Sequence, residues 1–395
     1  MSVRRGVSVA CACVLAAAPL RAAAQVGADD EGLKGGRRFL FALVGAVVGG
    51  VPAYLFAEER GGGVCTSRTC LTALGVTFGG TVGFLIGLEQ DHKHTRQMRR
   101  GPTLAYRPRT IPLGIVPEEM VPFGSGAVVT GIAGASLVYP DGRVLPRARG
   151  IRGIEDAAVL ESQGLVVFAT GSGLLAFPVA GDTVRGALID RTGGSALEAV
   201  ESELAVGGVR ELRWLRVTGP PEEPSAETTA TAQAPDLVYD VAWNPFQRVA
   251  WAVSGDRLVA YAPGTLEPLG ELRLPGTGLR VRVEGDRAVV AVGSEGVLLV
   301  DISDPAAPRP VRQIEGMRFA YAADLAGDRL YVAAGPEGLI AIDISDEDSP
   351  RVVGVGRSAR FVRDVFERDG EVWVLDREGR KLEIAELEGV ATSAP

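Results

Sequence analysis

Short apolar stretches alternate with turns along most of the chain after about residue 121. Clear cases are residues 165–169, 248–253 and 329–333, which are rich in β-branched and aromatic side chains. Such stretches of five or six residues are typical of β-strands, and each is followed by a glycine-containing turn and a second strand. The pattern predicts a series of β-hairpins without amphipathic helices between them.

One segment occurs twice in the C-terminal half. Residues 297–304 (Val-Leu-Leu-Val-Asp-Ile-Ser-Asp) return 42 residues later as residues 339–346 (Leu-Ile-Ala-Ile-Asp-Ile-Ser-Asp), and the glycine-containing turns before them recur as well. A period near 40 residues built from short strands indicates a repeat fold.

Aligning the hairpins gives seven candidate units, with centres spaced by 38, 38, 45, 40, 42 and 41 residues. Seven units of about four strands predict an all-β propeller with seven blades. Six blades remain open if the weakest unit, around Leu204, is not a blade. The longest interval contains residues 219–235, a Pro-, Glu- and Thr-rich stretch predicted to be an exposed loop. The centres are Val128, Val166, Leu204, Val249, Val289, Tyr331 and Val372.

The propeller is expected over residues 110–388, followed by a disordered tail at 389–395. Its last unit ends at residues 381–385 and is one strand short. We expect residues 110–116 to supply that strand and close the ring, because an open array leaves two strand edges unpaired.

The first 24 residues are expected to form a secretory signal peptide. Arg4 and Arg5 precede an apolar stretch at residues 7–20, and small residues lead to a cleavage site before Gln25. An uncleaved membrane anchor is the alternative. A short polar linker at residues 25–36 follows.

Two later stretches predict a transmembrane helical hairpin over residues 37–90. Residues 39–56 and 71–88 each give 18 uncharged residues. Each would form a helix of about 27 Å, which just reaches the hydrocarbon thickness of a bilayer. A basic juxtamembrane linker at residues 91–109 would join the hairpin to the propeller.

Glycines occur at every fourth position on one face of each predicted span. This spacing lets helices approach closely in lipid and resembles glycine-zipper membrane segments. It offers a route to homo-oligomers, although the chain has 52 glycines and small residues are common throughout. The glycines are Gly45 and Gly49 in the first span, and Gly75, Gly79, Gly83 and Gly87 in the second.

Two signals disagree about topology. A signal peptide followed by two spans places the propeller outside the cytoplasm, whereas basic residues flanking the hairpin favour cytoplasmic ends. We favour export. Cys65 and Cys70 lie in the loop between the spans, so they allow a disulfide if this loop is outside and remain thiols if it is inside.

Charge and composition exclude several function classes. Residues 1–100 carry 12 Lys/Arg against 7 Asp/Glu, so the remainder carries 29 against 42 and is strongly acidic. An acidic surface argues against nucleic-acid binding. The propeller region lacks His and Cys, which excludes Ser-His-Asp and Cys-His catalysis and histidine-ligated metals. His92 and His94 fit a solvated juxtamembrane collar, so we expect no metal or cofactor.

Acidic side chains are the remaining candidates for chemistry. Asp301, Asp304, Asp343 and Asp346 end the duplicated segments, where Asp typically caps a turn through bonds to the backbone. We expect this structural role rather than catalysis. The tryptophans at 214, 243, 251 and 373 are expected in the blade cores, although Trp243 could line a binding face.

Residues 296–305 with 307–311, and their copy at 338–350 with 352–354, resemble the LVIVD repeat of extracytoplasmic bacterial and archaeal β-propellers. This resemblance covers roughly 80 residues and implies a surface or secreted propeller. It brings no catalytic residues.

The sequence therefore predicts a membrane-anchored propeller of the bacterial cell envelope, in the periplasm or outside the cell. It would act as a binding or scaffold module for an envelope protein or polymer. The alternative is a carboxylate-dependent hydrolase or lyase on the same scaffold. That alternative requires two or more acidic residues within about 5–10 Å of each other at the central channel.

Overall fold

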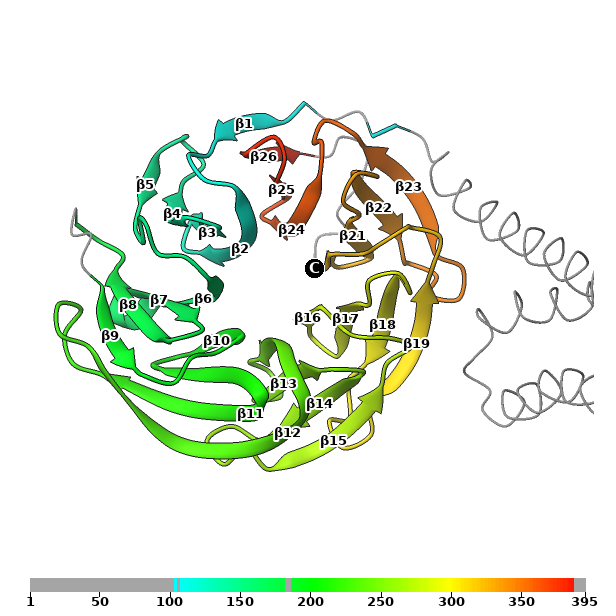
Figure 1. Ribbon diagram of the computed structural model, residues 1–395. Coiled ribbons are helices and arrows are strands. Elements are labelled where there is room, and N and C mark those ends of the chain that lie inside the picture. Colours follow the sequence, from blue (N-terminus) through cyan, green and yellow to red (C-terminus); the bar gives the residue numbers. More distant parts are fainter. Residues whose placement is uncertain (1–102, 105–106, 182–185, 387–395) are drawn as a thin grey trace, which may run out of the picture. The chain divides into compact units, whose positions relative to one another are not determined.

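The β-strands form antiparallel sheets arranged as blades around a central axis (Figure 1). This computed structural model describes residues 103–104, 107–181 and 186–386. The chain divides into units 1–97 and 98–395, and the described residues belong to the second. The predicted signal peptide, membrane spans, zipper glycines, Cys65 and Cys70 lie outside them and stay predictions. Within the described ranges, no helix has the length and apolarity needed to cross a bilayer.

Four of the blades each consist of four consecutive strands. Blade 1 contains β2 (Pro117–Phe123), β3 (Gly126–Gly131), β4 (Gly134–Val138) and β5 (Val144–Pro146). Blade 2 contains β6 (Ile154–Leu160), the 3₁₀ turn η1 (Glu161–Gln163), β7 (Leu165–Thr170), β8 (Gly173–Pro178) and β9 (Ala187–Asp190). Blade 4 contains β16 (Arg280–Glu284), β17 (Arg287–Ala291), β18 (Val297–Asp301) and β19 (Arg309–Ile314). Blade 5 contains β20 (Ala322–Ala326), β21 (Arg329–Ala333), β22 (Leu339–Asp343) and β23 (Arg351–Gly356).

Blade 6 closes the ring with a strand from the other end of the propeller. It contains β24 (Val362–Arg368), β25 (Glu371–Asp376), β26 (Lys381–Glu386) and the outermost strand β1 (Arg109–Pro112). The register places Thr110 opposite Glu383 and Ile111 opposite Leu382. The expected closing strand is confirmed, although it is shorter than residues 110–116.

Blade 3 is a six-stranded sheet. It contains β10 (Ala196–Val200), β11 (Glu203–Thr218), β12 (Ser225–Asn244), β13 (Val249–Ser254), β14 (Arg257–Tyr261) and β15 (Pro268–Arg273). The long strand β12 pairs with β11 through residues 225–237 and with β13 through residues 238–244.

Two expectations about this region were wrong. The preferred count of seven separate blades becomes six, because β12 joins the unit around Leu204 to the following unit in one sheet. Residues 219–235 were expected to be an exposed loop, but 225–235 belong to β12. Threonine is β-branched and favours strands, and its alternation with alanine suits a pleated, half-exposed surface.

Blade 3 still contributes two strands to the axis. Consequently β2, β6, β10, β12, β16, β20 and β24 contact one another in turn around a closed ring, and we call these the inner strands. We call the end of the axis at which the inner strands begin the mouth. The turns that follow the inner strands lie at the other end.

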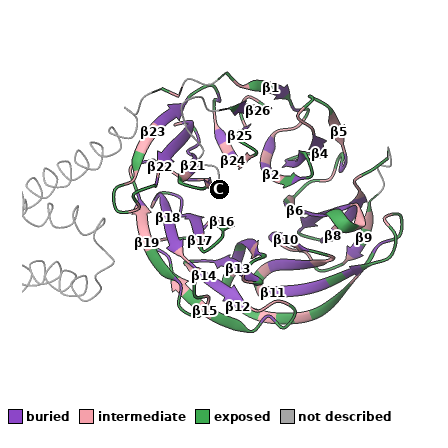
Figure 2. Ribbon diagram, turned by 180° about the vertical axis from the view of Figure 1, so that it is seen from behind, coloured by how far each residue is buried: buried purple, intermediate pink, exposed green. Residues whose placement is uncertain are grey.

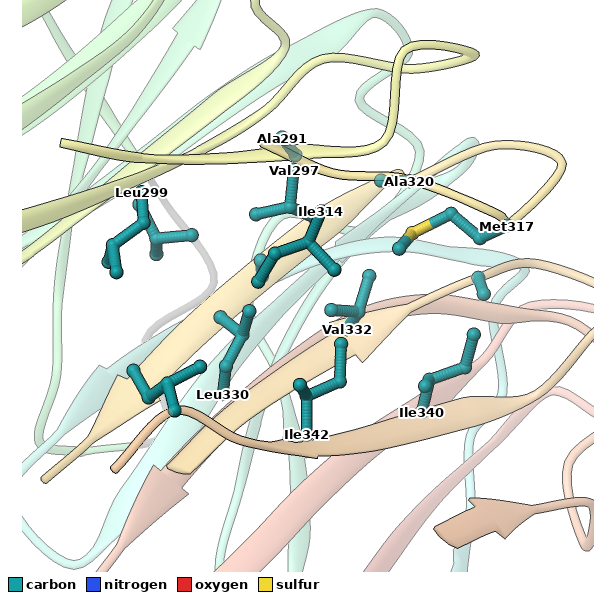
Figure 3. Close-up of a cluster of buried hydrophobic side chains, with 14 of the residues drawn as sticks. Ala291, Val297, Leu299, Ile314, Met317, Ala320, Leu330, Val332, Ile340 and Ile342 are labelled. Carbon is teal, nitrogen blue, oxygen red and sulfur yellow. The ribbon is translucent and has the colours of Figure 1, made fainter. Parts of the chain in front are cut away.

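Apolar side chains fill the space between neighbouring blades. Figure 3 shows one such layer, in which Val297 and Leu299 of blade 4 face Leu330, Val332 and Ile342 of blade 5. Figure 2 shows that burial is concentrated within the sheets, whereas exposed residues gather in turns and along the outer strands. The expectation that tryptophans fill blade cores is confirmed for Trp214, Trp251 and Trp373, which are almost fully buried.

The duplicated segments also repeat a glycine for a steric reason. Gly296 and Gly338 have φ angles of +83° and +95° in the turns before β18 and β22. A Cβ atom there would lie 2.2 Å from the Ile314 carbonyl oxygen and 2.1 Å from the Gly356 carbonyl oxygen, respectively. Only glycine fits such positions without moving the backbone.

Candidate functional site

The turn aspartates of the duplicated segments cap turns, as the sequence predicts. Each accepts a backbone N–H from the residue two positions later, and each of these bonds closes a local turn. The bonds are Ser303 N to Asp301 Oδ1 (2.9 Å), Ala306 N to Asp304 Oδ1 (3.0 Å), Ser345 N to Asp343 Oδ1 (3.0 Å) and Asp348 N to Asp346 Oδ1 (3.1 Å).

Hydrogen bonds favour the ionised form of two of these carboxylates, Asp301 and Asp343. Hydrogen bonds from Ser345, helped by Arg329, lower the pKa of Asp343 to about 2. Hydrogen bonds from Ser303 likewise lower the pKa of Asp301. Because the two segments belong to different blades and their aspartates bind their own turns, they do not form a duplicated active site.

A different set of acidic residues lies at the axis. Six of the seven inner strands carry an acidic residue at an equivalent position, and the seventh carries Arg282 in β16. We call the six the axis carboxyls. They are Glu119 in β2, Asp156 in β6, Glu198 in β10, Asp240 in β12, Asp324 in β20 and Asp364 in β24.

Most axis carboxyls bind the next inner strand around the ring. Such bonds to a neighbouring backbone hold adjacent inner strands in register at the axis. The bonds run from Leu197 N to Asp156 Oδ2 (2.7 Å), Trp243 N to Glu198 Oε1 (3.1 Å), Val281 N to Asp240 Oδ2 (2.8 Å), Glu367 N to Asp324 Oδ2 (2.7 Å) and Met120 N to Asp364 Oδ2 (2.8 Å).

A β-bulge precedes the acidic residue in four inner strands. The extra residue re-aims the side chain that follows, as bulges commonly do near functional positions. In β6 and β24 the second carboxylate oxygen then accepts the N–H of the next residue, Ala157 at 2.6 Å and Val365 at 2.9 Å. The bulged residues are Glu118, Glu155, Tyr239 and Arg363.

Arg280 joins opposite sides of the axis. Its guanidinium forms an ion pair with Glu119 of β2, and its Nη1 lies 3.5 Å from Asp240 Oδ1 of β12. Arg282 also approaches Asp240, with 3.6 Å between Nη1 and Oδ2. Since β16 and β2 are not neighbours in the ring, these side chains occupy the axis itself. Buried charges of this kind require such pairing.

Burial changes the protonation of two carboxyls in this network. Desolvation raises the pKa of Glu119, and the charge of Arg280 offsets this only in part. Desolvation, followed by the negative charge of Glu119, raises the pKa of Asp156 well above its usual range. Among the described residues, no hydrogen bond to Glu119 Oε2 is present.

Glu198 and Asp324 keep part of their surface open at the axis. Desolvation nevertheless raises the pKa of each to about 7, although each accepts a backbone N–H. Both groups therefore titrate near neutral pH, whereas the pKa values of Asp301 and Asp343 are lowered.

Three aromatic side chains and an arginine lie together at the mouth, between blades 5 and 6. The ring of Tyr321 lies 4.6 Å from that of Phe319 and 5.1 Å from that of Phe361, measured between centroids. The guanidinium carbon of Arg363 lies 5.2 Å from the Tyr321 centroid. We call these four half-buried residues the mouth cluster. They come from the segments leading into β20 and β24 and from the bulge of β24.

Ion pairs hold Arg363 of the mouth cluster in place, and a glycine makes room for Tyr321. Arg363 Nε lies 3.2 Å from Glu118 Oε2, and Arg377 Nε lies 2.7 Å from Glu118 Oε1. A Cβ on Gly335 would lie 2.7 Å from the Tyr321 ring, so the glycine leaves room for this aromatic side chain.

Sequence reasoning missed both the axis carboxyls and the mouth cluster. The axis carboxyls had a detectable signal, because their positions and that of Arg282 are separated by 37, 42, 42, 42, 42 and 40 residues. This period matches that of the hairpins. The mouth cluster had no such signal, since its aromatics occur in two blades only. Trp243 is half-buried, lies 6.2 Å from Trp214 between ring centroids, and binds Glu198 through its backbone.

Cys65, Cys70, His92 and His94 lie outside the described residues, as do the six zipper glycines. In the part of the chain that the structure covers, no three metal-ligating side chains are grouped to hold an ion.

A family model described as the LVIVD repeat matches residues 275–313 and 319–355. Two LVIVD repeats are present. They coincide with blades 4 and 5, so the resemblance expected from the sequence is confirmed for these two blades. No curated protein matches the chain.

Solved structures share the fold of the whole ring. The β-propeller domain of Cps50 (Swd1) from Myceliophteria thermophila has a TM-score of 0.59 at 10% identity, with 71% of this chain and 99% of that chain covered. The WD40 propeller domain of Doa1 gives 0.57 at 12% identity, covering 74% and 100%. A chain of the Mitotic Checkpoint Complex gives 0.59 at 10% identity, covering 72% and 92%. At such identity the likeness shows the fold alone.

Proposed function

We propose that this protein is a membrane-anchored, extracytoplasmic β-propeller that binds a protein or polymer of the bacterial cell envelope at its mouth. The mouth cluster is the observation that carries this proposal. Tyrosine and arginine are enriched among the residues that dominate binding energy at protein interfaces. Here Tyr321 contacts two further aromatic rings and the guanidinium of Arg363, and these side chains stay half-buried.

The mouth cluster is also ordered before any partner arrives. Tilted ring contacts of Tyr321 with Phe319 and Phe361, together with the Arg363–Glu118 ion pair, fix the side chains that a partner would contact. Ordering side chains normally costs part of the binding free energy, so a preordered cluster binds at lower cost.

The comparisons and the sequence support the class of function. The similar propellers include a chain of a multi-protein assembly, the Mitotic Checkpoint Complex, which is consistent with a role in protein binding. The predicted signal peptide and spans support the envelope location. The strongly acidic composition after residue 100 supports a protein or polymer partner over nucleic acid.

A carboxylate-dependent hydrolase or lyase is the second candidate. The axis brings Glu119, Asp156 and Asp240 together around Arg280, which is the convergence that this alternative requires. However, these carboxyl side chains belong to residues that are only 2–3% exposed. Most of their oxygens bind backbone N–H groups or a guanidinium, so these three carboxyls are not free to act on a substrate. Binding therefore remains the better proposal.

Site-specific photocrosslinking tests the proposed function. A photoreactive phenylalanine analogue replaces Phe319 in the full chain, expressed in a bacterial host with its membranes. We expect one discrete adduct, reduced at least several-fold by Arg363→Ala because this substitution removes the cation–π contact. Protease added after opening the outer membrane should digest the propeller if it lies outside the cytoplasm.

Phe246 provides the matched control. It is 85% exposed and lies in the turn after β12, at the end of the axis opposite the mouth. The same analogue at position 246 should not give the adduct. Equal adducts at both positions, or none at position 319, would contradict binding at the mouth.

A further inference from the structure

The two ends of the axis differ in charge. The mouth carries the segments that lead into the inner strands and the turns β3–β4, β7–β8, β13–β14, β17–β18, β21–β22 and β25–β26. Within the described residues these connections contain nine arginines and six acidic residues. The turns after the inner strands, and those that lead into β5, β9, β15, β19 and β23, contain two arginines and eleven acidic residues. The mouth therefore favours a negatively charged partner relative to the other end.

Unpaired positive charge at the mouth lies beside the aromatic rings. Arg318 directly precedes Phe319, and Arg360 directly precedes Phe361, so the same Arg-Phe pair recurs after 42 residues. Both arginines are exposed, and among the described residues neither guanidinium forms an ion pair. Their charges are therefore available to the carboxylates of a partner.

A second pair of arginines shares a single carboxylate. Arg363 Nε lies 3.2 Å from one oxygen of Glu118, and Arg377 Nε lies 2.7 Å from the other. One negative charge thus faces two positive charges, and all three side chains are half-buried. Arg377 also donates its backbone N–H to the Phe361 carbonyl oxygen at 2.9 Å, which ties this turn to the aromatic segment. The ion-pair group next to the rings therefore keeps a net positive charge.

The rings offer a partner an uneven apolar surface. The ring planes of Phe319 and Tyr321 are inclined by 43°, and those of Tyr321 and Phe361 by 59°. The backbone lies directly against the cluster, since a Cβ atom on Gly293 would lie 3.0 Å from the Phe319 ring. A sugar ring needs a flat, open aromatic face to stack on, whereas aromatic side chains pack against tilted rings edge to face. The cluster therefore fits a polypeptide better than a polysaccharide.

We propose that the partner bound at the mouth is a protein and that it binds through an acidic segment with apolar side chains. Its carboxylates pair with Arg318 and Arg360, and its apolar side chains contact the mouth cluster. Guanidinium groups suit this role because they bind carboxylates through two parallel hydrogen bonds. The inference rests on the proposed function, since it names the chemistry of the partner at the same site.

Identification of the photoadduct tests the class of partner. The full chain in its membranes carries the photoreactive analogue at position 319, and the adduct is digested and analysed by mass spectrometry. We expect a crosslinked peptide with more acidic than basic residues. An adduct with a polysaccharide, or with a neutral or basic peptide, would overturn the inference and leave binding at the mouth in place. A lipid adduct, or none, would overturn both.

Charge variants measure the contribution of the unpaired arginines. Arg318→Gln combined with Arg360→Gln should reduce the adduct on the order of fivefold, because two ion pairs at an exposed interface are lost. Arg318→Lys combined with Arg360→Lys keeps both charges and should lose clearly less, which a misfolded protein would not show. Arg309→Gln, at an exposed position on the outer strand β19, is the matched control and should leave the adduct unchanged. An unchanged adduct in the double glutamine variant would overturn the inference.

Salt provides a measurement on the unmodified charges. Raising the ionic strength from about 0.1 M to about 1 M shortens the Debye length from about 10 Å to about 3 Å. The adduct should therefore decrease with salt in the chain that keeps both arginines, and much less in the double glutamine variant. An adduct that does not depend on salt in either chain would show that apolar contacts alone hold the partner, and would overturn the acidic segment.

Discussion

Blade 5 carries two aspartates of the same chemistry in opposite environments. Asp343 ends β22 at a turn, where hydrogen bonds from Ser345 lower its pKa to about 2. Asp324 lies at the axis, where desolvation raises its pKa to about 7. Both accept a backbone N–H, so hydrogen bonding alone does not distinguish them. The difference is the loss of water around the charged form at the axis.

The comparison extends to the whole ring. Turn aspartates stabilise individual blades locally, whereas most axis carboxyls connect one inner strand to the next. Acidic residues at a repeat period therefore need not indicate chemistry at either end of the blade. Their burial and their partners decide what they do.

Removing the counter-charge at the axis should have the largest effect. Arg280→Met leaves Glu119 and Asp240 buried beside fewer positive charges. We expect the free energy of unfolding to fall by about 3–5 kcal/mol, the usual result of breaking one side of a buried ion pair. Urea unfolding at pH 7 measures this. The control Arg152→Met, at an exposed loop position, should change the free energy of unfolding by less than about 0.5 kcal/mol. Equal effects of the two substitutions would contradict the special role of the buried arginine at the axis.

Deleting one carboxylate from each class should give unequal losses. Asp364→Ala removes the acceptor for Met120 N and Val365 N at the junction of blades 1 and 6. Each buried donor left unsatisfied costs about 1–3 kcal/mol. Asp343→Ala leaves donors at a turn that water reaches, so we expect a loss of only about 1 kcal/mol. Unfolding midpoints of the two variants measure the difference, and a larger loss for Asp343→Ala would contradict it.

The smallest effect should appear in the pH dependence of stability. Because folding raises the pKa of Asp324 from 3.8 to about 7, its stabilising contribution is fully present below pH 3.8 and is lost as the pH rises through about 7. Asp343 behaves oppositely, since its contribution is present above pH 3.8 and is lost as the pH falls through about 2. Asp324→Asn keeps an acceptor without the charge.

Unfolding of Asp324→Asn and the wild type, compared between pH 4 and pH 8, tests the predicted direction of the change in stability with pH. The wild type should lose stability relative to the variant as the pH rises across the window set by 3.8 and about 7. Asp343→Asn, the control, should leave the slope in that window unchanged. Parallel curves for wild type and Asp324→Asn would show that Asp324 stays ionised throughout.

Much of the fold was predictable from local patterns. Strand pairs such as β21 and β22, the turns closed by Asp301 and Asp343, and the closing strand near Ile111 all followed from alternation, turn residues and an unpaired edge. The blade count was not predictable, because β12 runs unbroken through a stretch that composition marks as a loop. Pairing with β11 makes that stretch a strand rather than a loop.

The candidate site was predictable only in part. The spacing of Asp156, Glu198 and Asp240 could have marked one residue per inner strand. Their burial, the raised pKa values of Asp156 and Glu198, and the pairing of Asp240 with arginine could not be inferred. Arg280 and Glu119 are 161 positions apart and meet only when the ring closes. The mouth cluster depends in the same way on two blades placed side by side.

By itself the sequence determined the repeat, the strands and the turns, because these depend on residues within a few positions of one another. It also determined which chemistries are absent from residues 101–395, since that region has no His or Cys. Only the tertiary structure decided that six sheets make the ring and that carboxyls from different blades share one axis. These features arise from contacts between distant segments, and such contacts exist only after the chain has closed on itself.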